Sequence, residues 1–97
     1  MKKRYKIIVT GNVQRVGFRN HAAQVADKLK VTGKAVYVNH DIIIEAEGFV
    51  SELEAFINWC RKGPEGAEID SLELTETMLQ NDREFKIVHG LVFSKAS

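Results

Sequence analysis

The chain has 97 residues, of which 28% are charged and 44% hydrophobic, the balance of a soluble domain with one modest core. A net charge of +1, from 14 basic and 13 acidic residues, argues against a strongly electrostatic partner such as duplex DNA. The single cysteine, Cys60, excludes an internal disulfide, and a reducing cytoplasm is the expected setting. The apolar run after the basic start is too short for a membrane span.

The first half of the chain predicts a strand, a helix and a hairpin. In residues 4–11 apolar side chains alternate as in a half-buried strand. After a Gly-flanked turn, one apolar face at helical spacing is formed by Phe18, Ala22, Val25, Ala26 and Leu29. Gly33 is expected to end this helix. Two strands, 35–39 and 42–48, then form a tight hairpin around His40 and Asp41.

The second half predicts another helix and two more strands. Ser51 and Glu54 form a capping box that opens a helix, and Gly63-Pro64 ends it. Cys60 falls on the apolar stripe of this helix, so a buried, inert thiol is expected. Strands follow over 69–76, with Leu72 and Leu74 directed inward, and over 85–89.

The order β-α-β-β-α-β-β is typical of a ferredoxin-like α+β sandwich, with both helices on one face of an antiparallel sheet of four to five strands. We expect residues 1–97 to form a single domain. This fold hosts many functions, so the fold decides little about activity.

The stretch "GNVQRVGFR", residues 11–19, is neither strand nor helix in pattern. A Gly-bracketed turn that opens a helix directs several unpaired backbone N–H groups toward one point, at the positive end of the helix dipole. A phosphate fits there, and the planar fork of Arg19 matches phosphate oxygens. The alternative is a plain turn whose Arg19 extends into solvent.

This stretch resembles the acylphosphatase signature G-x-V-Q-G-V-x-F-R. The similarity continues in "LKVTG", "EAEG", "WCRKGPEGAEIDSLELTE" and "FKIVH", so it covers nearly the whole chain. The resemblance implies hydrolysis of an acyl phosphate to a carboxylate and inorganic phosphate, without a metal or other cofactor. It implies a small-molecule substrate, phosphate or sulfate at the loop, and no nucleic acid or membrane partner.

The resemblance also implies roles for individual residues. The phosphoryl group would be held by Arg19 and by the backbone amides of Gln14, Arg15, Val16, Gly17 and Phe18. An asparagine on the second strand positions the attacking water in the family. The simplest alignment places Tyr37 at that position. Asn39 is the nearest asparagine, and it would reach the catalytic place if the strand contained a bulge and Asn39 paired with Ile42.

Arg15 is a departure within the signature itself, because the family has glycine there. If the position requires a positive φ, an arginine costs about 1 kcal/mol or more. Otherwise Arg15 adds a second positive group near the pocket mouth, or extends into solvent. His21, His40 and His89 are scattered and show no metal-ligand spacing. His21 is expected to be a solvated or capping residue.

Two other functions remain open at this point. The first is a non-catalytic anion-binding module that kept the loop and lost water positioning. The second is a single-stranded RNA binder that uses the open sheet face. The hypothesis of RNA binding is disfavoured, because the outer strands lack a pair of aromatic residues with basic neighbours on which bases could stack.

Overall fold

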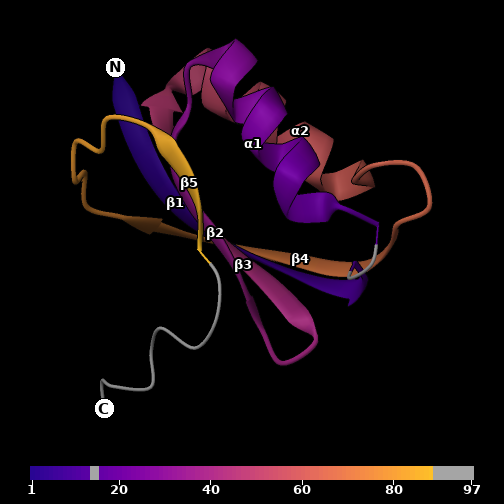
Figure 1. Ribbon diagram of the computed structural model, residues 1–97. Coiled ribbons are helices and arrows are strands. Elements are labelled where there is room, and N and C mark those ends of the chain that lie inside the picture. The colour runs from indigo at the N-terminus through magenta and orange to yellow at the C-terminus, as the bar shows by residue number, and fades with distance from the viewer. Residues whose placement is uncertain (14–15, 89–97) are drawn as a thin grey trace.

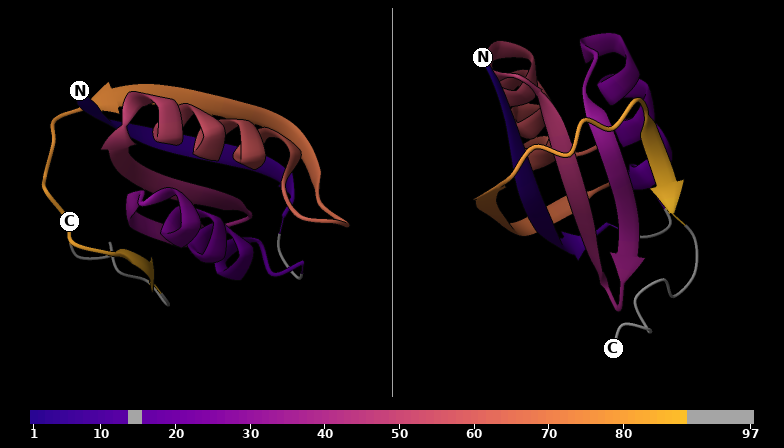
Figure 2. Two further views of the ribbon diagram at one scale, coloured as in Figure 1. Left: turned by 90° about the horizontal axis from the view of Figure 1, so that it is seen from above. Right: turned by 90° about the vertical axis from the view of Figure 1, so that its left-hand side faces the viewer.

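A computed structural model describes residues 1–13 and 16–88 (Figure 1). The seven elements follow the predicted order: β1 (Lys2–Asn12), α1 (Phe18–Leu29), β2 (Thr32–Val38), β3 (Asp41–Phe49), α2 (Val50–Lys62), β4 (Glu68–Thr77) and β5 (Phe85–Val88). The strands form one sheet in the order β4-β1-β3-β2-β5, and both helices cover the same face (Figures 1 and 2). The predicted ferredoxin-like α+β fold is confirmed.

The sheet is mixed rather than wholly antiparallel. β1 runs antiparallel to β3 and β4, and β2 runs antiparallel to β3, but β5 pairs parallel with β2, with Gly33 opposite Phe85. The reason is the connection over 78–84, which passes across the face of the sheet that the helices leave uncovered (Figure 2, right). It starts from one edge strand and delivers β5 to the other edge, so β5 runs in the same direction as β2.

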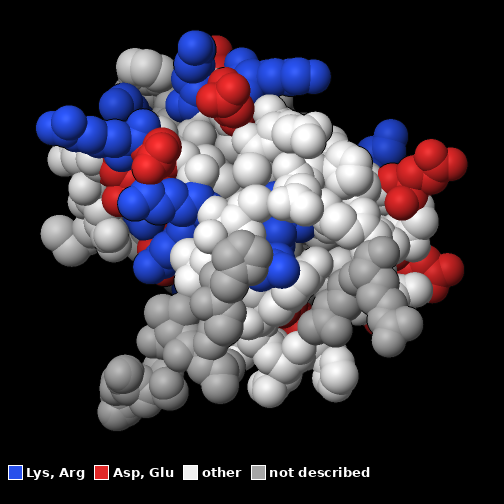
Figure 3. Space-filling model, viewed as in Figure 1, with Lys and Arg blue, Asp and Glu red and all other residues white. Residues whose placement is uncertain are grey.

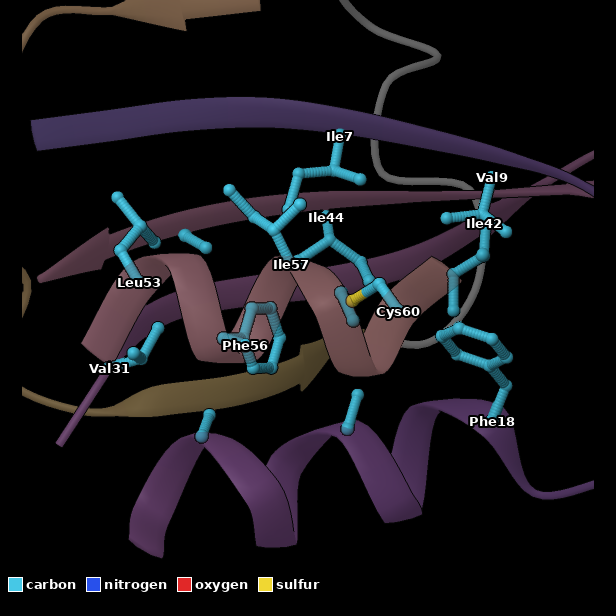
Figure 4. Close-up of a cluster of buried hydrophobic side chains, with 14 of the residues drawn as sticks. Ile7, Val9, Phe18, Val31, Ile42, Ile44, Leu53, Phe56, Ile57 and Cys60 are labelled. Carbon is cyan, nitrogen blue, oxygen red and sulfur yellow. The ribbon is translucent and has the colours of Figure 1, made fainter. Parts of the chain in front are cut away.

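The core lies between the sheet and the two helices (Figure 4). Inward residues of the central strands meet one stripe from each helix, and the fully buried members include Ile7, Val9, Phe18, Ala22, Ala26, Ile42, Ile44, Leu53, Phe56 and Cys60. The alternation and helical spacing read from the sequence therefore select the correct faces. Burial raises the pKa of the Cys60 thiol, as expected of an inert structural cysteine.

Two of the three predicted helix boundaries need correction, and the third is confirmed, because α2 ends at Lys62 with Gly63 as its C-cap. α1 ends at Leu29, where Lys30 takes a left-handed conformation and its N–H reaches the last carbonyls of the helix. Gly33 instead lies within β2, at φ 137°, where a Cβ would collide with the Glu45 carbonyl of the neighbouring strand. The glycine is therefore required by close strand contact and not by a helix end.

The capping box is wrong as well. α2 begins at Val50 with Phe49 as its N-cap, and no side chain caps it. Ser51 already lies in the first turn and donates a hydrogen bond to Glu52, 2.7 Å away, rather than to the backbone. The chain enters this helix directly from β3, which leaves no separate turn for a serine cap.

The inward assignment of β4 holds only in part. Leu72 is half-buried, but Leu74 is 38% exposed. β4 is an edge strand, and an edge strand receives less cover from the helices than the central strands do.

A buried ionic cluster holds the 78–84 connection against the uncovered face of the sheet. Arg4 on β1 and Glu47 on β3 are 1% and 2% exposed and lie opposite each other in the ladder. The Arg4 guanidinium donates to Glu47 at 3.0 Å and to Asp82 of the connection at 3.0 Å. The Glu47 carboxylate also accepts the backbone N–H groups of Gln80 and Asn81. The connection is therefore bonded to both central strands.

Removing one partner of this cluster should destabilise the fold. Glu47→Leu removes a buried negative charge that balances Arg4 and leaves two backbone N–H groups without an acceptor. The free energy of unfolding should therefore fall by about 3 kcal/mol or more. Urea unfolding measures the loss. Glu84→Gln, which removes an exposed pair with Lys86, serves as the control and should be nearly neutral. Equal effects of the two substitutions would contradict a structural role for the buried cluster.

The same cluster predicts a pH dependence of stability. Burial alone would raise the pKa of Glu47, but hydrogen bonds from the Gln80 N–H, Arg4 and the Asn81 N–H hold it below the ordinary value of 4.5. A lowered folded pKa means that this stabilisation is complete above about pH 4.5 and is lost as the pH falls through the folded value. In urea unfolding below that pH, Glu47→Gln should lose less stability with falling pH than the wild type does.

Candidate active site at the start of α1

The start of α1 has the geometry of an anion site. Gly17 precedes the helix at φ 71° and ψ 30°, and Phe18 is fully buried against Trp59, with ring centroids 5.2 Å apart. Phe18 therefore fixes the first turn against the core. Among the described residues no side chain caps this end, and the first turn holds no acidic residue. The positive end of the helix dipole thus remains uncompensated by the described side chains.

Arg19, the next residue, is held by two neighbouring strands at the edge of the sheet. Its Nη1 donates to the Val88 carbonyl of β5 at 3.0 Å. Its Cζ lies 4.1 Å from the centroid of the Tyr37 ring on β2, within range for a cation–π contact. The side chain is half-buried, so the alternative in which Arg19 extends freely into solvent does not describe this structure.

Tyr37 also contacts the start of the loop. Its hydroxyl donates to the Val13 carbonyl at 3.2 Å, and Val13 is fully buried. The sequence pointed to Tyr37 only as the aligned replacement for the family's asparagine. Neither its contact with Arg19 nor the role of Val88 was predicted, because both depend on how β2, β5 and α1 meet in space.

The bulge in β2 that would bring Asn39 to the catalytic place is absent. Tyr37 pairs with Ile42 and Val38 with Asp41 in an unbroken register, so Asn39 does not pair with Ile42. The hairpin turn consists of Asn39 and His40, one residue earlier than expected. Asn39 takes φ 59°, a left-handed conformation that asparagine tolerates better than most residues. Regular strand geometry therefore leaves Tyr37 at the aligned position, and the catalytic role of Asn39 stays a prediction.

Gln14 and Arg15 lie outside the described residues, so their predicted part in the anion site is not placed. Val16 and Gly17 are half-buried at the helix start. His21 is exposed, as expected of a solvated residue, and its Nδ1 donates to the Gly17 carbonyl at 2.9 Å, a contact that satisfies no N–H group of the helix. Within residues 1–13 and 16–88, no group of His, Cys, Asp and Glu could hold a metal ion, and no helix is long and apolar enough to cross a membrane.

Charged side chains are unevenly distributed over the surface seen in Figure 3. Most lie on the side where the N-terminal end of β1 and the 78–84 connection lie, a smaller group of both signs lies at the opposite edge, and the area between them is mostly uncharged. The described contacts of the Arg19 guanidinium are a backbone carbonyl and an aromatic ring, and they include no carboxylate. Such surroundings leave its charge available to an anion.

The fold and the sequence agree on one family. The acylphosphatase family model matches residues 5–87, which is most of the chain. The chain therefore belongs to the acylphosphatase family.

Individual relatives agree with this assignment. The chain is 37% identical over 87 residues to the acylphosphatase of Aliivibrio fischeri, an alignment that covers 89% of this chain and 97% of the relative. The crystal structure of acylphosphatase from Bacillus subtilis superposes with a TM-score of 0.86 at 33% identity, over 91% of this chain and 99% of that one. Full-length HypF, in its phosphate- and nucleotide-bound form, superposes with a TM-score of 0.85 at 30% identity, over 91% of this chain and 12% of that one.

The backbone at Gly17 gives a direct test of the loop geometry. Gly17→Ala adds a Cβ to a left-handed residue, so the free energy of unfolding should fall by roughly 1–2 kcal/mol, or the loop should shift to avoid the strain. Gly48→Ala is the control, because φ there is not left-handed and its Cβ would meet no atom closer than 3.4 Å. Urea unfolding and phosphate titration of both variants measure the two effects. A Gly17→Ala variant with wild-type stability and wild-type phosphate affinity would contradict the requirement for glycine.

Proposed function

We propose that this protein hydrolyses acyl phosphates to a carboxylate and inorganic phosphate, with the phosphoryl group held by Arg19 and the backbone amides of residues 14–18. Membership of the acylphosphatase family supports the reaction. The observation that carries the site is the placement of Arg19 beside the uncapped start of α1, fixed by the Val88 carbonyl and the Tyr37 ring. The helix N–H groups and the guanidinium then face one anion together.

The chemistry asks little of the protein beyond positioning. A water oxygen forms a bond to phosphorus while the bond from phosphorus to the acyl oxygen breaks, and its electron pair leaves with the carboxylate. The water proton passes to solvent or to a phosphate oxygen. A carboxylate is a good leaving group and needs no acid, so orientation and neutralisation of the phosphoryl oxygens supply most of the rate.

We also propose a location, a domain organisation and a set of partners for the protein, on the basis of the same family resemblance. We place the protein in the cytoplasm as one domain over 1–97, without a cofactor and without nucleic acid or membrane partners. The comparisons contain nothing that favours the non-catalytic anion-binding alternative, since the curated relatives are named acylphosphatase. Turnover of a simple acyl phosphate such as benzoyl phosphate separates the two functions.

Arg19 should dominate catalysis. Arg19→Ala should lower kcat/KM for benzoyl phosphate by about 100-fold or more, the scale for a principal donor to developing charge. Arg19→Lys keeps the charge but loses the bidentate fork, so it should recover little. Phosphate titration should give its largest amide shifts within residues 14–19 in the wild type.

The matched control is Arg61→Ala, which removes an exposed arginine from the last turn of α2. It should leave turnover and phosphate binding unchanged. Arg19→Ala activity within about threefold of wild type, which is under 1 kcal/mol, would rule out the assigned role. Largest amide shifts away from the start of α1 would rule out the anion site.

The reaction should not depend on a metal. Dialysis against excess chelator is expected to leave the rate of benzoyl phosphate hydrolysis unchanged, because positioning and the guanidinium supply the charge stabilisation. A rate that collapses and returns with added zinc or magnesium would show that a metal site has been missed.

The role of Asn39 is tested by Asn39→Gly, which deletes the amide while keeping a residue that accepts φ 59°. With Tyr37 in the aligned register, kcat should stay within about threefold of wild type. Asn39→Ala is a poorer test because it also strains the turn. A large loss of kcat in the glycine variant, with phosphate binding retained, would assign water positioning to Asn39 despite its place in the turn.

A further inference from the structure

We propose that Tyr37 is a positioning residue for this site, and that its ring holds the Arg19 guanidinium in the orientation that receives the phosphoryl group. This inference rests on the proposed function and assigns a role that the alignment with the family's asparagine does not predict. It is carried by contacts made at both ends of one side chain.

The ring end of Tyr37 limits the movement of Arg19. The guanidinium carbon lies 4.1 Å from the ring centroid, a separation at which the plane of the cation and the π-face attract each other. The Val88 carbonyl takes one of the five guanidinium N–H donors, at Nη1. One stacking contact and one hydrogen bond together select one rotamer of a long side chain. An arginine ordered in advance loses less rotamer freedom when the anion binds.

The hydroxyl end of Tyr37 is already committed to the backbone. It donates its single proton to the Val13 carbonyl at 3.2 Å, at the last described residue before the loop. That proton is therefore not available to a phosphoryl oxygen. The same side chain thus contacts both the guanidinium of Arg19 and the backbone at the entrance of the loop. Both contacts are made from one residue of β2, which fixes them relative to the sheet.

The backbone supports this arrangement. Tyr37 pairs with Ile42 in an unbroken register, and Ile42 is fully buried, so the base of the ring is fixed by the central part of the sheet. Tyr37 itself is half-buried and packs against the core. A side chain held in this way provides a rigid platform for Arg19, in contrast to a residue on a loop.

Three substitutions separate the ring from the hydroxyl. Tyr37→Leu removes both, and the inhibition constant of inorganic phosphate should rise roughly threefold to tenfold. Tyr37→Phe keeps the ring, and the constant should rise by no more than about twofold. Tyr37→Asn installs the family's amide without a ring, so phosphate affinity should fall as in Tyr37→Leu, whatever happens to kcat.

A second readout reports on Arg19 directly. A proton held over an aromatic face is shielded by the ring current, so the Arg19 Nε–Hε resonance should lie upfield of those of Arg61 and Arg83. It should stay there in Tyr37→Phe and move downfield in Tyr37→Leu. The wild-type position tests the inference even if a variant fails to fold, because a resonance that coincides with those of the surface arginines would overturn the stacked arrangement.

Tyr5→Leu is the matched control, because Tyr5 is the chain's other tyrosine, is also half-buried against the core, and lies on β1. It should lose stability without losing phosphate affinity. An equal loss of phosphate affinity in Tyr5→Leu would mean that the effect is general destabilisation, and this would overturn the inference. So would a Tyr37→Phe variant as impaired as Tyr37→Leu, or a silent Tyr37→Leu.

The failure of this inference is distinguishable from failure of the proposed function. If Arg19→Ala is inactive while Tyr37→Leu binds phosphate normally, the function stands and the role of Tyr37 falls. If Arg19→Ala hydrolyses benzoyl phosphate like the wild type, the proposed site falls, and the role of Tyr37 falls with it.

Discussion

The buried ion pair between Arg4 and Glu47 holds the connection that leads to the last strand, and the candidate site depends on that strand. The two charges hold the 78–84 connection across the uncovered face of the sheet, through a bond to Asp82 and through two backbone N–H groups. The connection then delivers β5 to the free edge of β2. The carbonyl that orders the guanidinium of α1 belongs to β5, so an ionic contact on one face of the sheet supports the site beside the helices on the other.

The ion pair is not explained by stability alone. Moving a guanidinium and a carboxylate out of water is costly, and a pair of this kind often contributes little net free energy compared with an apolar replacement. Among the described residues the Nε of Arg4 also lacks a partner. The cluster instead favours one position of the 78–84 connection on the sheet over shifted ones. Glu47 accepts from both adjacent amides of the connection and from Arg4, so a connection shifted by one residue would leave a buried charge or N–H group unsatisfied.

Local patterns were sufficient for the elements and the core, because alternation and helical spacing are properties of neighbouring residues. They misplaced two helix ends, and they gave no information where distant segments meet. Gly33 resembles a helix stop in sequence, but it is required by the close approach of β3. Arg4 and Glu47 look like ordinary surface charges in the sequence, but they are buried where the crossing connection bonds to them. At the site, the Gly-flanked turn and Arg19 were found from sequence, while the contacts with Tyr37 and Val88 required the sheet order.

Where the resemblance to the family places an asparagine, this chain has Tyr37. An amide and an aromatic ring at this position would perform different tasks in the site. An amide could orient a water, whereas the tyrosine hydroxyl is bonded to the Val13 carbonyl and the ring faces a cation. For an ester with a poor leaving group this exchange would be severe. A carboxylate leaves readily, so binding the phosphoryl group in a fixed orientation accounts for more of the rate, and a guanidinium ordered before the anion arrives serves that purpose. If Tyr37 positions Arg19 as we propose, a residue that directs no water still contributes to the reaction, because it keeps the guanidinium in place for the phosphoryl group.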